Sequence, residues 1–185
     1  MNTQLTRDSD GRFGALSIAL HWLMALLIVA VYACMELHEF FPEGSALRAG
    51  LKTWHYMLGL SVLLLVVLRI VARLAGTAPP ITPAPPLWQA RLAGLIHLAL
   101  YALMIGMPIV GWLTLSAGGE PIPFFGIELP PLVAADEAWA DWIKEIHETG
   151  ASVGYFLIGG HALAALFHHY FVRDNTLRRM LPVQR

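Results

Sequence analysis

Charged residues are scarce in this sequence: Asp, Glu, Lys and Arg together make up 14% of its 185 residues. A soluble domain usually carries about 25% of such residues. There is also only one cysteine, Cys34, so neither a disulfide bond nor a metal site built on paired cysteines can form within the chain. These shortages argue against an ordinary soluble domain and against a fold held together by cysteines.

Four long stretches of the sequence contain no charged residue, at residues 14–35, 53–68, 92–119 and 149–172. A membrane-spanning helix needs roughly 20 mostly apolar residues, and the second stretch reaches this length if Arg69 snorkels to the interface. The first stretch is longer than the apolar core of a signal peptide, so we interpret it as a retained helix. The sequence therefore predicts one all-α integral membrane domain over residues 1–185, a four-transmembrane-helix bundle with helices at about 14–36, 52–74, 91–116 and 145–172.

Lys and Arg are distributed unequally between the two ends of this predicted bundle. Nine of the twelve would lie on the side of the N-terminus, the loop between the second and third helices and the C-terminal tail. Because cytoplasmic loops carry an excess of Lys and Arg, we expect both termini to be cytoplasmic. The loops on the opposite side hold ten of the thirteen acids against three bases, so the outer face should be negative overall.

Histidines occur within these apolar stretches, where an ionisable side chain is costly and by default marks a function. His147 and His161 lie fourteen residues apart in the fourth predicted helix. With a rise of about 1.5 Å and a turn of about 100° per residue, they share roughly one face and are about 21 Å apart. Imidazole is a common axial ligand of haem iron, and this spacing suits two haems stacked through the bilayer. The sequence has no Cys-x-x-Cys-His motif, which excludes covalently attached c-type haem.

Each haem needs a second axial ligand at the same depth. The first predicted helix carries His21 near its inner end, and the second carries His55 at its outer end. We therefore expect His55 to pair with His147 toward the outer surface. His21 would pair with His161 toward the cytoplasm, so that the chain binds two haem b groups. His97 is an alternative ligand at the inner level, or it bridges helices or faces a quinone. A non-redox protein whose histidines only bridge helices would leave the matching depths unexplained.

Basic residues near both levels suit the haem propionates, which need charge partners. The candidates are Arg48 and Lys52 at the outer level, and Arg12, Arg69 and Arg73 at the inner level. Ordinary anchoring at the membrane interface explains the same residues equally well.

Three further histidines lie at predicted helix ends. His38, beside Glu36 and Glu39, is expected to be a solvated loop residue. His168 and His169, at the inner end of the fourth helix, are either interface residues or proton donors to a substrate at that surface.

Several motifs resemble the prokaryotic cytochrome b561 family, and the resemblance extends over nearly the whole chain. They are His21-Trp22, Trp54-His55, Ile96-His97, His147-Glu148-Thr149, Gly154-Tyr155-Phe156, Gly160-His161, and the tail from His168-His169-Tyr170-Phe171 to Arg179-Met180. The resemblance implies a di-haem b cytochrome of the bacterial inner membrane. It also implies that the ligands of the haem iron are His21, His55, His147 and His161.

The resemblance implies an activity as well. The family includes superoxide oxidases, which take an electron from superoxide at the outer face and deliver it to ubiquinone. For this chain it implies a superoxide:ubiquinone oxidoreductase, with the quinone near the inner haem and His168 and His169 as its catalytic proton donors. The alternative is a cytochrome b anchor subunit that passes electrons between a docked redox partner and the quinone pool. The expected partners are thus the lipid bilayer, ubiquinone, and superoxide or another outer-face donor, with no nucleic acid.

Overall fold

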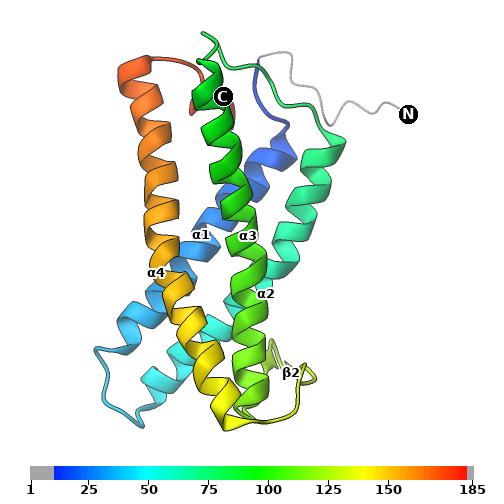
Figure 1. The fold of residues 1–185 in the computed structure, drawn as a ribbon, viewed down its shortest axis with the longest axis vertical. Coiled ribbons are helices and arrows are strands. Elements are labelled where there is room, and N and C mark those ends of the chain that lie inside the picture. Colours follow the sequence, from blue (N-terminus) through cyan, green and yellow to red (C-terminus); the bar gives the residue numbers. More distant parts are fainter. Residues whose placement is uncertain (1–10, 183–185) are drawn as a thin grey trace.

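Four long helices make up most of the structure, a computed structural model that describes residues 11–182. They are α1 (Ala15–His38), α2 (Ala46–Ala75), α3 (Leu87–Ala117) and α4 (Glu137–Phe167). Successive helices run in opposite directions along the bundle (Figure 1). All four are long and apolar enough to cross a membrane. The predicted set of four long apolar helices is confirmed.

Three of the helices begin earlier than the sequence predicted. They start at residues 46, 87 and 137, and the predicted starts were about 52, 91 and 145. The predictions placed the starts next to charged residues, but a helix continues beyond its apolar stretch when its end is capped. The Ser45 hydroxyl accepts the Arg48 N–H at 3.3 Å at the start of α2, and the Asp136 carboxylate accepts the Trp139 N–H at 3.1 Å at the start of α4.

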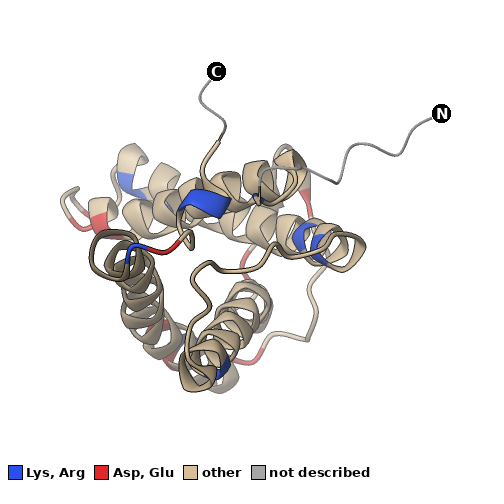
Figure 2. Ribbon diagram, turned by 90° about the horizontal axis from the view of Figure 1, so that it is seen from above, with Lys and Arg blue, Asp and Glu red and all other residues tan. Residues whose placement is uncertain are grey.

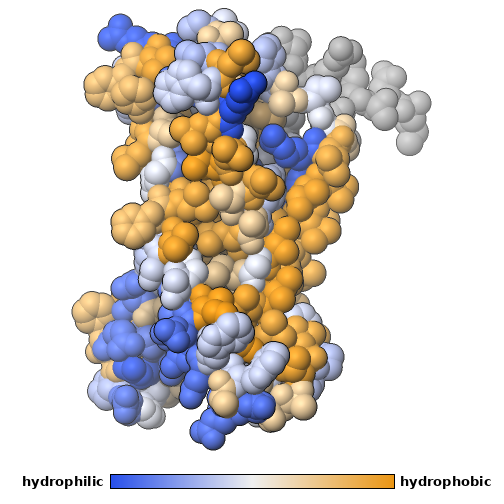
Figure 3. All heavy atoms as spheres, viewed as in Figure 1, coloured by the Kyte–Doolittle hydropathy of each residue, from blue (hydrophilic) through white to orange (hydrophobic). Residues whose placement is uncertain are grey.

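A small buried core joins α1, α2 and α3. Met24 of α1 packs with Val62 and Val66 of α2, and Tyr101 and Met104 of α3 lie at the edge of this cluster. Many other apolar side chains are exposed. On the face shown in Figure 3 they cover the middle of the bundle, whereas hydrophilic side chains gather at its lower end. A helix that is apolar on its outer surface is suited to lipid as its solvent.

α1 contacts α4 through a pair of tyrosines. The Tyr32 hydroxyl donates to the Ala151 carbonyl at 2.9 Å, and the Tyr32 and Tyr155 ring centroids are 4.4 Å apart. The Tyr155 hydroxyl in turn donates to the Glu36 carboxylate at 2.5 Å. A Cβ at Gly154 would overlap the Tyr32 hydroxyl, so this helix contact requires glycine.

A short hairpin lies at the end of the bundle where α1 ends and α2 begins. β1 (Pro123–Phe124) pairs antiparallel with β2 (Ile127–Glu128), and β1 lies against α2. At the tip, the Phe125 ring contacts Trp54 of α2 with centroids 6.3 Å apart. The Phe125 N–H donates to the Met57 sulfur at 3.4 Å, which fixes the hairpin on this helix.

The chain changes direction abruptly after α4. The helix continues as one π-helical turn, η2 (His168–Val172), and Arg173 then adopts left-handed backbone with φ at 60°. A 3-10 turn, η3 (Arg178–Met180), follows. π-Helical turns of this kind are frequent at functional sites.

Hydrogen bonds dock this tail on the end of the bundle opposite to the hairpin. The Trp22 indole of α1 donates to the Met180 carbonyl at 2.7 Å. Asn175 and Thr82 of the proline-rich 76–86 loop exchange two hydrogen bonds, of 2.8 and 3.2 Å. Both ends of the described chain therefore lie at the same end of the bundle (Figure 1).

Candidate functional site

One pair of imidazoles lies between α2 and α4. The ring centroids of His55 and His147 are 6.0 Å apart, and the ring planes are inclined at 82°. The Nδ1 atom of His55 lies 3.0 Å from the Val31 carbonyl of α1. Because a carbonyl can only accept, the ring proton sits on Nδ1 in this hydrogen bond, and the Nε2 lone pair is free. A histidine that binds a metal is commonly oriented in this way.

His147 is positioned mainly by packing. A Cβ at Gly111 of α3 would lie 3.1 Å from the His147 Cε1 atom, so the ring can rest on α3 because residue 111 has no side chain. The Nδ1 atom of His147 is buried and has no hydrogen-bond partner within residues 11–182.

The separation of these rings suits a metal ion between them. A bond from a metal to an imidazole nitrogen is about 2 Å long and the ring centre lies about 1 Å further, so two imidazoles on opposite sides of one ion have centroids about 6 Å apart. His55 and His147 meet this requirement.

A second cluster of imidazoles joins α1, α3 and α4. The centroid of His161 is 6.4 Å from that of His21 and 5.3 Å from that of His97. The first distance leaves room for a metal ion, whereas the second is shorter than two ligands of one ion require. His97 is also exposed, while His21 and His161 are half-buried. The structure therefore brings together both pairs that the sequence predicted, and it places His97 in edge-to-face contact beside the inner one.

In the described part of the chain, there is no group of three or more His, Cys, Asp or Glu side chains that could hold a metal ion. Each pair could thus supply only two ligands. Two axial imidazoles are what a haem iron takes from a protein in a bis-histidine cytochrome.

Glycines beside both pairs border open space. A Cβ added at Gly59, one turn after His55, would meet nothing within 4 Å. The same is true of Gly159 and Gly160, which directly precede His161. A flat group next to the imidazoles would therefore meet no side chain from these three positions, which is compatible with haem.

Arginines lie around the cluster of His21, His97 and His161. Arg69 of α2 is close enough to interact electrostatically with all three imidazoles of that cluster. Arg73 and Arg179 act on His97 in the same way. Figure 2 looks onto this end of the bundle and shows Lys and Arg segments on the tail and on the helix ends around it. Arg179 was missed by the sequence reasoning, because only the folded tail brings it close to His97.

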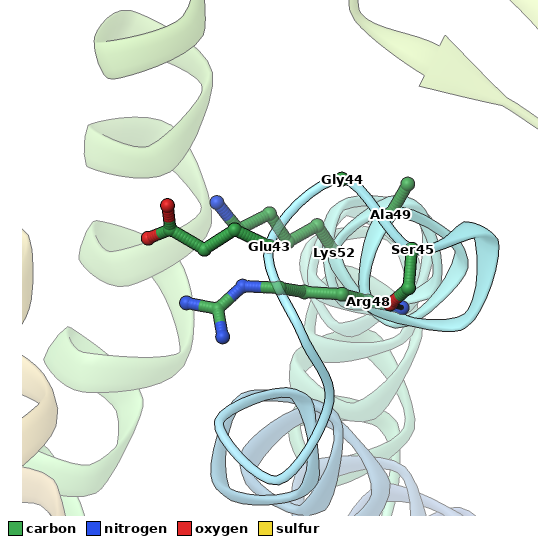
Figure 4. Close-up of a pocket in the computed structure, with 6 residues that line it drawn as sticks. All are labelled: Glu43, Gly44, Ser45, Arg48, Ala49 and Lys52. Carbon is green, nitrogen blue, oxygen red and sulfur yellow. Dashed lines mark hydrogen bonds between the residues drawn. The ribbon is translucent and has the colours of Figure 1, made fainter.

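The two basic candidates at the outer level line a pocket at the start of α2, formed by Glu43, Gly44, Ser45, Arg48, Ala49 and Lys52 (Figure 4). The Arg48 guanidinium donates to the carbonyls of His38 and Phe41, at 3.3 and 3.0 Å, and pairs with Glu39 at 3.4 Å. Arg48 thus caps the end of α1. Its contact with a propionate, like that of Lys52, stays a prediction.

His38 is not a solvated loop residue, and that prediction was wrong. It is the last residue of α1 and is only 5% exposed. Its Nδ1 atom lies 2.5 Å from the Met35 carbonyl and its Nε2 atom 3.2 Å from the Glu39 carboxylate. The neighbouring acids suggested a loop, but the helix continues past them and buries the ring.

His168, at the end of the bundle where the tail docks, pairs with a buried carboxylate. Its Nδ1 atom lies 2.5 Å from Asp174, which is 1% exposed and also accepts the Thr176 N–H at 2.8 Å. Burial alone would raise the pKa of the Asp174 carboxyl, but the hydrogen bonds from His168 and Thr176 hold this pKa below its ordinary value. The carboxylate is therefore ionised at neutral pH, and it orients the imidazole with Nε2 directed away from it.

Asp174 was not predicted as a site residue. The π-helical turn and the left-handed Arg173 bring it back beneath His168, and its N–H donates to the His168 carbonyl at 3.3 Å. No local pattern in the sequence marks this turn. The neighbouring His169 has a buried Nδ1 atom with no partner in the described residues.

Known proteins resemble the chain over nearly its whole length. It matches the family described as prokaryotic cytochrome b561 over residues 12–183. It is 40% identical over 171 residues to cytochrome b561 homolog 1 of Escherichia coli strain K12, covering 92% of this chain and 97% of that protein. It is 37% identical over 174 residues to the probable superoxide oxidase CybB of Yersinia pestis, with 94% and 98% covered. With cytochrome b562 of Cereibacter sphaeroides it shares 31% identity over 174 residues, with 90% and 92% covered. The resemblance seen in the sequence motifs is confirmed.

Proposed function

We propose that this chain, which belongs to the prokaryotic cytochrome b561 family, holds two haems and carries electrons through the membrane from superoxide at the outer face to ubiquinone at the inner face. Membership of a cytochrome b family implies haem, and the four apolar helices make the chain a multi-pass membrane protein. The observation that carries the proposal is the presence of two imidazole pairs with centroids 6.0 and 6.4 Å apart.

In this proposal His55 and His147 hold the outer haem, and His21 and His161 hold the inner one. The free Nε2 of His55 and the open space at Gly59 support the outer assignment. The open space before His161 supports the inner one. A haem bound by two imidazoles supplies one-electron chemistry, because its iron changes between two oxidation states.

α4 sets the separation of the two levels. His147 and His161 lie fourteen positions apart in one α-helix, which corresponds to a rise of about 21 Å. Apolar side chains around the bundle keep water and ions from the space between the levels. A single electron would thus pass between two sites held apart by a rigid element.

The inner end, in this proposal, faces the cytoplasm. The termini themselves lie outside the described residues, but residues 11 and 182 lie at this same end, together with the proline-rich loop. The excess of Lys and Arg in these segments supports the assignment.

Reduction of ubiquinone also requires protons, which we assign to the histidines after α4. Two superoxide ions lose one electron each and become oxygen, and the quinone takes up both electrons and two protons from the cytoplasm. The ionised Asp174 holds His168 in one orientation with Nε2 directed away from it, so this nitrogen is placed to pass a proton to a substrate at that end. His169 is the second candidate donor, since it lies next to His168 on the same π-helical turn.

Superoxide as the donor is supported by the relative named probable superoxide oxidase. The ten acids of the outer loops oppose the approach of an anion. In the pocket at the start of α2, Arg48 is paired with Glu39 and Glu43 is part of the lining, so Lys52 supplies the positive charge there. Lys144 lies 3.8 Å from Glu148, which offsets its charge. Attraction of superoxide would therefore be local to the start of α2.

Proteoliposomes that contain a ubiquinone analogue test this function. Superoxide generated outside should reduce the haem and form quinol, and superoxide dismutase should abolish both effects. A preparation that holds haem but does not respond to superoxide would contradict the donor. A stoichiometric redox subunit that copurifies in mild detergent would then identify the chain as a cytochrome b anchor.

A further inference from the structure

Two guanidinium groups at the inner end have buried nitrogens without a hydrogen-bond partner in residues 11–182. They are the Nε atom of Arg179 and the NH1 atom of Arg12. Nearly all buried hydrogen-bond donors in native proteins have a partner. A donor without one calls for an explanation, such as a bound group. These atoms therefore point to an acceptor that the polypeptide does not provide.

Arg179 is held firmly in position by three segments. It belongs to the 3-10 turn of the tail, and its NH1 atom donates to the Pro79 carbonyl of the proline-rich loop. Its guanidinium carbon lies 5.4 Å from the centroid of the Phe13 ring, and the Phe13 N–H donates to the Arg179 carbonyl at 3.1 Å. The side chain is thus preorganised, with part of its donor edge unused.

The surroundings of Arg179 are rich in positive charge. It acts electrostatically on His97, as do Arg69 and Arg73. None of these arginines forms an ion pair within 4 Å with a carboxylate in the described part of the chain. Asp174 influences Arg179 electrostatically, but its oxygens are bound by His168 and Thr176.

We infer that Arg179, together with Arg12, which directly precedes Phe13 in the chain, forms an anion site that binds the carboxylates of the inner haem, so that the tail closes over this cofactor. The inference rests on the proposed function, because it takes the group at the inner histidines to be haem. A guanidinium edge and a carboxylate match in geometry and can form two parallel charge-assisted hydrogen bonds. The phosphate of a lipid headgroup would satisfy the same donors, and the experiment separates the two.

The test compares Arg179→Gln with Arg178→Gln in the purified full-length protein. Arg178 is a matched control, since it lies in the same 3-10 turn and is exposed while Arg179 is half-buried. Redox titration should show a more negative midpoint potential for the inner haem in Arg179→Gln alone, because a lost positive charge destabilises the reduced, more negative state. The outer haem should be unchanged in both variants.

Arg179→Lys keeps the positive charge, and it provides a second variant if Arg179→Gln does not fold. Its inner potential should lie between those of the wild type and Arg179→Gln. Unchanged potentials in Arg179→Gln, or equal shifts in the Arg178 control, would overturn the inference. Unchanged potentials with less copurified phospholipid would assign the site to a headgroup instead. Failure of the proposed function would give a different result, because the wild-type protein would then hold no haem at His21 and His161.

Discussion

The separation of two rings decides which histidines can share a metal ion. His161 lies 6.4 Å from His21 and 5.3 Å from His97, and only the longer distance accommodates an ion between the rings. From the sequence, His97 was an open alternative, because its depth matches that of His161. Depth along a helix can be read from residue positions, whereas the distance between rings on different helices depends on how the helices pack.

Replacing His147 by Ala should remove the outer haem and leave the inner one, because the two imidazole pairs share no side chain. The haem content per chain should fall by about half, with a bis-histidine spectrum retained. Pyridine-haemochrome quantification of the purified variant measures this.

His97→Ala is the matched control for this experiment, as it removes an imidazole without removing a proposed ligand. It should keep the haem content of the wild type. Loss of both haems in His147→Ala would show that the sites depend on each other. Loss of a haem in His97→Ala would make His97 a ligand.

The contacts made by residues of the tail could not be predicted from the sequence. The pairing of His168 with Asp174 and the approach of Arg179 to His97 both depend on a π-helical turn and on the left-handed conformation of Arg173. Arginine carries no intrinsic preference for this conformation, so it gives no local signal.

Among the elements, the four helices were predictable, but the starts of three of them were not. Each apolar stretch is long enough to span a bilayer. A single segment that crosses lipid must be a helix, because only a helix pairs all its backbone N–H and C=O groups within itself. The earlier starts of α2 and α4 depend on the caps at Ser45 and Asp136, which lie in polar segments outside these stretches.

The contact of α1 with α4 gives a prediction at this scale. Gly154→Ala should lower the thermal stability of the haem-bound protein, because the added Cβ would overlap the Tyr32 hydroxyl. Overpacking of this kind costs about 1–3 kcal/mol. The midpoint of thermal haem loss in detergent, followed by Soret absorbance, measures the effect.

Gly50→Ala provides the control, because a Cβ at Gly50 of α2 meets nothing within 4 Å. Alanine is favoured over glycine inside a helix by about 1 kcal/mol, so this variant should be as stable as the wild type or slightly more so. Equal midpoints for Gly154→Ala and the wild type would show that α1 and α4 are not held together by this contact.

For the whole molecule, three features lie along one axis. The imidazole pair of His55 and His147 lies toward the hairpin end, where ten acids of the sequence are predicted to gather. The cluster around His161 lies toward the tail, with arginines around it. An apolar band separates the two ends. This order suits transfer of an electron inward and uptake of protons at the tail, which is the direction that we propose.

The number of haems per chain is the most direct test of this account. Pyridine-haemochrome analysis of the purified wild-type protein, combined with a protein assay, should give two haem b groups for each polypeptide. One haem per chain, or a colourless protein, would contradict it.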